Sequence, residues 1–304
     1  MRAFHMVLSL LFAIIVTMKT TNIDLYAYFG LPREKKAKGY LHGMFFDQEN
    51  PRVLQIGKRI RPMVLIIPGG GYHWVSYREG EPVALRFLQK GYNAFWLEYS
   101  TDEDGVAHPT QLKEAMMALL YIHKKAALFC SDPEQIAVIG FSAGGHLAGL
   151  LASRTEDEKV LVPQYLKTEP HIKACCFSYP VVTSQGKSQG SQYTFMFLTG
   201  GNKNLEKEVS LENRVTKDFP PSFIWTTAED TTIEPQQSEY LAKCLTAKGV
   251  KNKCIVYPHG AHGTASGDIN SFNAEKLATI PAENTTWVDE AAEFFKSCGL
   301  AIKD

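Results

Sequence analysis

The chain has 304 residues, of which 45% are hydrophobic and 21% are charged. These fractions exclude a disordered or fibrous protein, and the length fits one large domain or two small ones. The 32 basic side chains balance the 32 acidic ones. Nucleic acids and anionic membranes select proteins with a basic excess or a basic stripe, so we expect neither as a stable partner. A small molecule is the expected partner, and the sequence gives no indication of the oligomeric state.

The amino terminus carries an uncharged apolar run at residues 6–16, preceded by Arg2. The run suits the core of a signal peptide and is shorter than a membrane span of about 20 residues. No A-x-A cleavage site follows it, and Met18 begins a segment that looks like an ordinary cytosolic start. Three interpretations of residues 1–17 stay open: a signal peptide, a start codon assigned too far upstream, and an uncleaved anchor. The first predicts a secreted protein and the second a cytoplasmic one.

After this segment, short apolar runs alternate with amphipathic segments of helical length. Strands are expected at 62–68, 92–99, 135–140, 172–179, 222–227 and 253–257. Most of these runs are continuously apolar, which is typical of strands buried on both faces of a parallel sheet. Helices are expected at 82–90, 111–128, 143–153 and 236–248. This alternation predicts an α/β fold with a doubly wound, mostly parallel sheet, in one domain over residues 18–304.

One segment, residues 182–221, interrupts the alternation. It is rich in Ser, Gln, Gly, Asn and Lys and has no strong hydrophobic period. Long insertions after a strand of an α/β sheet usually cover the carboxyl ends of the strands, where binding sites are built. We therefore expect a partial, lid-like insertion, with a plain surface excursion as the alternative.

The sequence Gly-Phe-Ser-Ala-Gly at 140–144 has the form G-x-S-x-G, with a predicted strand before it and a predicted helix after it. Such a turn is tight, and a side chain at Gly140 or Gly144 would collide with the neighbouring strand or helix. Ser142 is therefore expected to present its hydroxyl at the start of a helix, as a nucleophile. A glycine-rich turn with an incidental serine is the alternative.

A glycine triplet, residues 69–71, follows the strand predicted at 62–68. The position matches the oxyanion loop of α/β-hydrolases, whose backbone N–H groups bind the oxygen of a tetrahedral intermediate. We expect the triplet to act there together with the N–H group of Ala143. Just beyond it, His73 is a candidate substrate contact, and Tyr72 is a candidate for the substrate pocket, with core packing as its alternative.

A nucleophilic serine needs a base and an acid that orients the base, in the chain order serine, acid, histidine in α/β-hydrolases. Glu229 and Asp230 follow one predicted strand, and His259 and His262 follow another. We favour Asp230 as the acid. We favour His262 as the base because two glycines bracket it in a loop that can reach inwards. Glu229 and His259 stay open as the alternatives.

Metal and cofactor sites have no support in the sequence. The six cysteines form no C-x-x-C pair and no Cys/His ligand spacing, and no HExxH, EF-hand or phosphate-loop motif occurs. We therefore expect neither a metal nor a cofactor.

These motifs resemble the α/β-hydrolase esterases of the acetyl-xylan and feruloyl esterase-like group, which are related to bacterial acetyl esterases. The resemblance covers most of the chain after about residue 60 and is carried by PGGGY at 68–72, the segment at 78–100, IGFSAGGHLA at 139–148, the segment at 210–230 and YPHGAHG at 257–263. It implies the α/β-hydrolase fold, with Ser142 as nucleophile, Asp230 as acid, His262 as base, and Gly70, Gly71 and Ala143 at the oxyanion hole. One departure is that Thr-Thr-Ile-Glu follows Asp230, where the family usually has D-x-x-V-P.

Together the motifs predict a serine carboxylic-ester hydrolase that forms an acyl-enzyme. The resemblance implies short, acetyl-like acyl groups and carbohydrate esters as substrates. Two alternatives stay open: a serine peptidase of the same fold, and a binding protein that keeps the fold without the catalysis.

Overall fold

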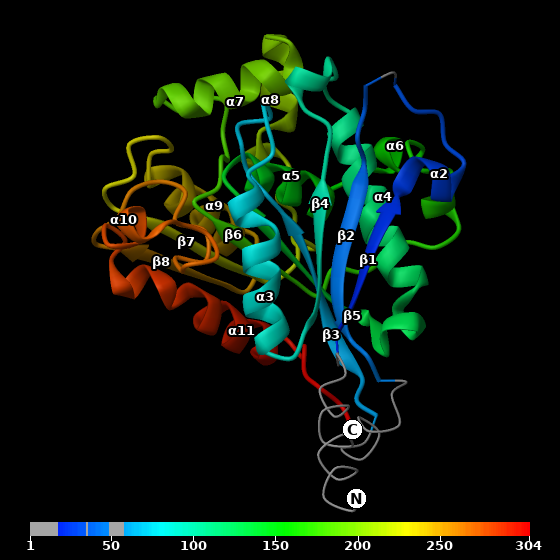
Figure 1. Cartoon of the computed structure of the whole chain (residues 1–304). Helices are drawn as coiled ribbons and strands as arrows, with labels where there is room; N and C mark the ends of the chain where they lie inside the picture. Colours follow the sequence, from blue (N-terminus) through cyan, green and yellow to red (C-terminus); the bar gives the residue numbers. More distant parts are fainter. Residues whose placement is uncertain (1–17, 35, 49–57) are drawn as a thin grey trace, which may run out of the picture.

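The structure, a computed structural model, describes residues 18–34, 36–48 and 58–304. The segment interpreted as a signal peptide, a misassigned start or an anchor, residues 1–17, lies outside the described residues. The strands are β1 (Met18–Asp24), β2 (Tyr40–Phe46), β3 (Arg61–Ile67), β4 (Asn93–Glu98), β5 (Ser131–Phe141), β6 (Ala174–Ser178), β7 (Ser222–Thr227) and β8 (Asn252–Tyr257). They form one twisted sheet in the order β1-β2-β4-β3-β5-β6-β7-β8 (Figure 1).

The sheet is parallel from β4 to β8, as predicted, and antiparallel where β2 pairs with β1 and with β4. We did not predict β1 or β2. The β1 sequence, MKTTNID, is mostly polar, and its side chains are partly exposed along the edge of the sheet. An edge strand of this kind carries little of the apolar pattern from which buried strands are recognised.

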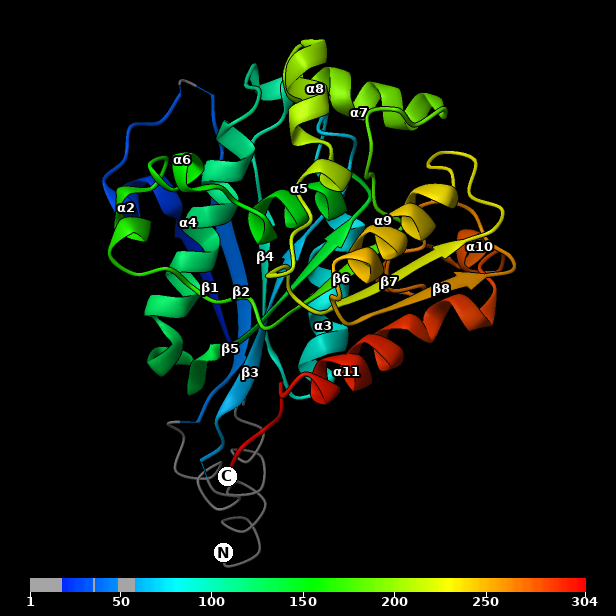
Figure 2. The same cartoon turned by 180° about the vertical axis from the view of Figure 1, so that it is seen from behind.

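Helices cover both faces of the sheet (Figures 1 and 2). One face carries α2 (Leu25–Phe29), α4 (Thr110–Lys124), α5 (Ala143–Ala152) and α9 (Gln236–Ala247), and the other carries α3 (Glu81–Gln89) and α11 (Trp287–Ser297). Two short helices, α6 (Glu156–Lys159) and α10 (Ala274–Leu277), lie at the periphery. In the described part of the chain, no helix combines the length and the apolar character that crossing a membrane requires.

The central strand β3 shows why the predicted strands lack alternation. All seven of its residues are buried. Met63, Leu65 and Ile67 point into the core on the α4 and α5 face, whereas Val64 and Ile66 point into the core on the α3 and α11 face. Because both faces are covered, both sets of side chains must be apolar.

The segment at residues 182–221 contains two helices that we did not predict, α7 (Gln189–Thr199) and α8 (Lys203–Val209), which lie together beyond the sheet at the top of Figure 1. The two ends of α7 carry cap signals that were visible in the sequence. The Ser188 side chain accepts a hydrogen bond from the N–H of Ser191, and Gly200 ends α7 with φ 63°. These caps mark the ends of α7, a helix whose hydrophobic periodicity is too weak to predict it.

A buried carboxyl group connects α4 to the end of β4. Glu114 is completely buried and accepts hydrogen bonds from the Tyr26 hydroxyl (2.9 Å), the Ser100 N–H (2.6 Å) and the Ser100 hydroxyl (2.6 Å). Burial raises the pKa of Glu114 from 4.5 to about 7, although these hydrogen bonds oppose the rise.

This shift predicts how a Glu114→Gln variant compares with the wild type. The unfolded carboxyl ionises near pH 4.5 and the folded one near pH 7. Between these values the folded wild type binds more protons than the unfolded chain, so its stability falls as the pH rises. Glutamine does not titrate, so the free energy of unfolding of the variant, relative to the wild type, should rise across this window and level off above it. Urea unfolding at about pH 5 to pH 8 measures the difference, and a difference independent of pH contradicts the assignment.

Candidate active site

Ser142 lies at a sharp turn between β5 and α5. Its backbone has φ 52° and ψ −119°, a conformation that residues other than glycine rarely adopt. A Cβ at Gly140 would lie 2.3 Å from the carbonyl oxygen of Gly144, and a Cβ at Gly144 would lie 2.2 Å from that of Ile67. These contacts explain the two glycines. Ser142 is more covered than we expected, with 7% of its surface exposed, since His262 lies against its hydroxyl.

His262 lies on the loop after β8 and reaches back to the Ser142 turn. Its Nε2 is 3.0 Å from Ser142 Oγ, and its Nδ1 is 2.6 Å from Asp230 Oδ2. Gly260 and Gly263 have φ values of 121° and 79°, so the loop turns where other residues would be strained. The imidazole therefore lies between a hydroxyl and a carboxylate, the arrangement that general-base activation of a serine requires.

Asp230 follows β7 and is almost fully buried. Its Oδ1 accepts hydrogen bonds from the N–H groups of Thr232 and Ile233, both at 2.9 Å, and its Oδ2 faces His262. These backbone donors fix the carboxylate so that one oxygen is directed to the imidazole. The residues after Asp230 that depart from the family pattern are thus the ones that orient it.

The two alternative residues form a separate pair. Glu229 accepts a hydrogen bond from the N–H of Gly260 at 2.9 Å and lies 3.0 Å from Nδ1 of His259. Both side chains are more than half exposed. The structure therefore brings Ser142, His262 and Asp230 together and holds Glu229 and His259 apart from them.

The glycine loop, residues 68–72, follows β3 and lines the same pocket as Ser142. Gly70 has φ 120°, and a Cβ there would lie 2.0 Å from the carbonyl oxygen of Trp74. Only glycine fits this turn. Its carbonyl oxygen accepts hydrogen bonds from the N–H groups of His73 and Trp74, both at 3.1 Å, which fix the course of the loop.

Three backbone donors predicted for the oxyanion hole are free in this arrangement. Among the described residues, the N–H groups of Gly70 and Gly71 have no acceptor. Ala143 is the first residue of α5, and the first N–H groups of a helix have no acceptor within it. Each donor therefore remains available to a ligand oxygen.

The pocket at Ser142 has a volume of about 320 Å³, and α7 supplies part of its wall. The wall residues recur at the spacing of one helical face: Gly190, Tyr193, Thr194 and Phe197. Tyr193 is 46% exposed, and the His73 ring stacks on Phe197 with centroids 4.6 Å apart. Our sequence interpretation placed His73 near the substrate and missed the α7 residues. Their spacing is the signal that could have revealed them.

Tyr72 is the candidate pocket residue that the structure places elsewhere. Its side chain is fully buried, does not line the described pocket, and is hydrogen-bonded through its hydroxyl to Nδ1 of His146 at 2.9 Å. Nε2 of His146 lies 2.8 Å from the carbonyl oxygen of Val209, so it carries the proton and Nδ1 accepts from Tyr72. Burial lowers the pKa of His146 to about 3. Tyr72 is therefore a core residue that fastens the glycine loop to α5.

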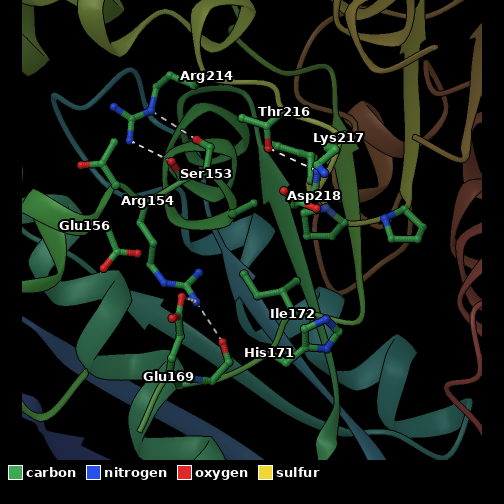
Figure 3. Close-up of a pocket in the computed structure, with 16 residues that line it drawn as sticks. Ser153, Arg154, Glu156, Glu169, His171, Ile172, Arg214, Thr216, Lys217 and Asp218 are labelled. Carbon is green, nitrogen blue, oxygen red and sulfur yellow. Dashed lines mark hydrogen bonds and ion pairs between the residues drawn. The ribbon is translucent and has the colours of Figure 1, made fainter. Parts of the chain in front are cut away.

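A larger hollow, about 740 Å³, lies at the amino ends of β6 and β7 (Figure 3). Its polar groups bind one another: Arg154 pairs with Glu169 at 2.9 Å, and Nε of Arg214 donates to the Ser153 hydroxyl at 3.2 Å. Ser153 Oγ donates in turn to the Gly149 carbonyl oxygen. Within the part of the chain that the structure describes, no histidine is hydrogen-bonded to the Ser153 hydroxyl, in contrast to Ser142, whose hydroxyl lies beside His262. Among the described residues, no cluster of three or more His, Cys, Asp or Glu side chains could hold a metal ion.

Comparison with known proteins agrees with this architecture. The family model BD-FAE matches residues 54–245. The solved structure of an alpha/beta hydrolase from a Medee basin deep-sea metagenome is 28% identical, with a TM-score of 0.70 over 93% of this chain and 99% of its own. An acetyl ester-xyloside bifunctional hydrolase from Caldicellulosiruptor lactoaceticus is 27% identical, with a TM-score of 0.70 over 86% of this chain and 88% of its own. The predicted α/β-hydrolase fold is confirmed.

A curated relative, endo-1,4-beta-xylanase B of Butyrivibrio fibrisolvens, is 34% identical over 74% of this chain. The match covers 36% of that protein, and the matches to the next two curated relatives cover 50% and 43% of theirs. The chain thus corresponds to half or less of the length of these relatives.

The geometry predicts a reactive Ser142. A fluorophosphonate probe should attach to its Oγ, with loss of fluoride, because His262 can take the hydroxyl proton. Asp230→Asn should slow labelling about 10²- to 10⁴-fold, since the amide cannot accept from the imidazole as a carboxylate does. The matched control Glu229→Gln should label within about twofold of the wild-type rate, because an exposed pair contributes little. Peptide mass spectrometry measures the rates, and equal slowing in both variants contradicts the assignment of the acid.

Proposed function

The chain belongs to the BD-FAE family of α/β hydrolases, and from this premise we propose that it is a serine ester hydrolase that removes short acyl groups from carbohydrate esters. One observation carries the proposal: a chain of hydrogen bonds joins Ser142, His262 and Asp230, and it lies beside a pocket that the glycine loop lines. This geometry supports acyl transfer to a serine.

The first step is attack of Ser142 Oγ on the ester carbonyl carbon. Nε2 of His262, 3.0 Å away, takes the hydroxyl proton as the C–O bond forms. Asp230 Oδ2 accepts from Nδ1 of the imidazole at 2.6 Å and stabilises the positive charge that develops there. The imidazolium then gives its proton to the departing alcohol, which leaves an acyl group on Ser142.

The negative charge of the tetrahedral intermediate develops on the former carbonyl oxygen. The free N–H groups of Gly70, Gly71 and Ala143 are the donors proposed to bind it, and one such donor contributes about 3 kcal/mol in hydrolases where it has been removed. Water, deprotonated by the same His262, then attacks the acyl carbon, and Ser142 leaves with the returned proton.

The pocket and the relatives support the proposed substrate class. A cavity of about 320 Å³ is at the small end of ligand sites, which favours a short acyl group. Trp74 and Tyr193 are each 46% exposed at this pocket and offer flat apolar surfaces on which a sugar ring can pack. The relatives named endo-1,4-beta-xylanase B and acetyl ester-xyloside bifunctional hydrolase make a xylan-derived alcohol the favoured choice.

Hydrolysis of p-nitrophenyl esters tests the proposal. We expect kcat/KM to fall from the acetate to the butyrate and octanoate, because longer chains exceed the pocket. Ser142→Ala and His262→Ala should each lower the rate about 10²-fold or more. Activity that survives in Ser142→Ala would falsify the mechanism. A folded wild type that is inert on every ester and cleaves peptide anilides would favour the peptidase alternative.

A further inference from the structure

We infer that Glu79 is a positioning residue: it fixes the glycine loop relative to the histidine loop (residues 258–265), and it acts on the histidine loop through Tyr179. The inference rests on the proposed function, because these two loops carry the oxyanion donors and the base. It assigns a role to a buried carboxylate that the proposed mechanism does not use.

Glu79 is a buried acid without a basic partner. It is 3% exposed, and no Lys, Arg or His forms an ion pair with it in the part of the chain that the structure describes. Its oxygens are instead bound by two neutral donors. Oε2 accepts from the N–H of Gly69 at 2.8 Å, and Oε1 accepts from the Tyr179 hydroxyl at 2.7 Å. Burying a charged group costs free energy unless the group is hydrogen-bonded, so breaking either of these two bonds would be unfavourable.

The contact with Gly69 orients the glycine loop. A Cβ at Gly69 would lie 2.9 Å from Glu79 Oε2 and 2.7 Å from the Phe141 carbonyl oxygen, so the backbone passes close to both groups. Because the Gly69 N–H is bound to Glu79, the first peptide of the triplet has a fixed orientation. The peptides of Gly70 and Gly71 follow this fixed peptide directly, so its orientation restricts theirs.

The contact with Tyr179 extends to the histidine loop. Tyr179 follows β6 with φ 40°, a strained conformation for a tyrosine. Its hydroxyl accepts from the N–H of Ala265 at 3.0 Å, and its ring packs edge-on against His262 with centroids 4.7 Å apart. Burial, assisted by the charge of Glu79, raises the pKa of Tyr179 well above its ordinary value, so its hydroxyl remains a donor. The Glu79 carboxylate thereby links Gly69, through Tyr179, to the loop that carries His262.

A carboxylate suits both partners. The Gly69 N–H and the Tyr179 O–H both donate to it, and bonds to a charged acceptor are stronger than bonds to a neutral one. In Glu79→Gln, which keeps the shape, the side-chain oxygen can accept from the Gly69 N–H, while the NH₂ group faces the Tyr179 hydroxyl and can only donate to it. The charge-assisted bond between residue 79 and Tyr179 is therefore lost while the packing volume is preserved.

A double-mutant cycle tests this role with p-nitrophenyl acetate. Glu79→Gln should lower kcat about 10- to 100-fold and change KM less than about threefold, because hydrogen bonds to charged groups are strong and the loss affects donor and base geometry more than ground-state binding. Tyr179→Phe should lower kcat less. The double variant should be no slower than Glu79→Gln, since both changes break the same connection.

Glu114→Gln is the matched control. Glu114 is also a buried acid that accepts from a tyrosine hydroxyl and a backbone N–H, but it contacts neither loop. It should leave kcat within about twofold of the wild-type value. A general effect of buried carboxylates would lower kcat equally in both variants and would overturn the inference.

Two further outcomes contradict the positioning role: a Glu79→Gln variant with wild-type kcat, and effects that multiply in the double variant. If Glu79→Gln does not fold, as judged by thermal unfolding, Tyr179→Phe carries the test, and an unchanged kcat in that variant overturns the inference. The rate of fluorophosphonate labelling of Ser142 is a second readout that needs no ester substrate. If the proposed function is wrong and the positioning role is right, the wild type should be labelled normally but should hydrolyse no ester. The labelling rates of these variants should then keep the same order.

Discussion

The constraint on which the site depends is the strained turn at Ser142. A residue with a side chain and φ 52° costs about 1–3 kcal/mol, so the surroundings must hold it in place. Two backbone hydrogen bonds do this: the Ser142 N–H donates to the Ser178 carbonyl oxygen at 2.9 Å, and its own carbonyl accepts from the Val181 N–H at 3.1 Å. Both partners lie at or just after the end of β6. The end of β6 and the residues just after it therefore fix the backbone of Ser142.

The parallel sheet supplies the rest of the geometry. The expected nucleophile, acid and base follow β5, β7 and β8, whose carboxyl ends meet at one edge. The glycine loop follows β3, the neighbour of β5 on the other side. Loops that begin at fixed strand ends need only a few side-chain contacts to complete a site, and Asp230 and Glu79 provide two of them. Rigid strands and short anchored loops are what preorganised donors require.

The sequence predicted the parts of this molecule whose signals are local. The continuous apolar run of β3, the G-x-S-x-G turn and the bracketing of His262 by glycines each follow from residues close together in the chain. The contacts of Asp230 with His262 and of Tyr72 with His146 join residues distant in sequence, so the sequence left Glu229 open as the acid and left Tyr72 as a candidate for either the pocket or the core. The edge strand β1 and the wall formed by α7 were missed because their residues are mostly polar or weakly periodic.

The central claim, that Ser142 accepts the acyl group, is tested most directly by trapping the intermediate. Wild-type protein mixed with p-nitrophenyl acetate and quenched in acid within the first turnover should yield one acetylated peptide by mass spectrometry, the peptide that contains Ser142. We expect the acetyl group on that serine and its absence from the same peptide in Ser142→Ala. Rapid ester hydrolysis with no acetyl group on Ser142, or with the group on another residue, would contradict this claim.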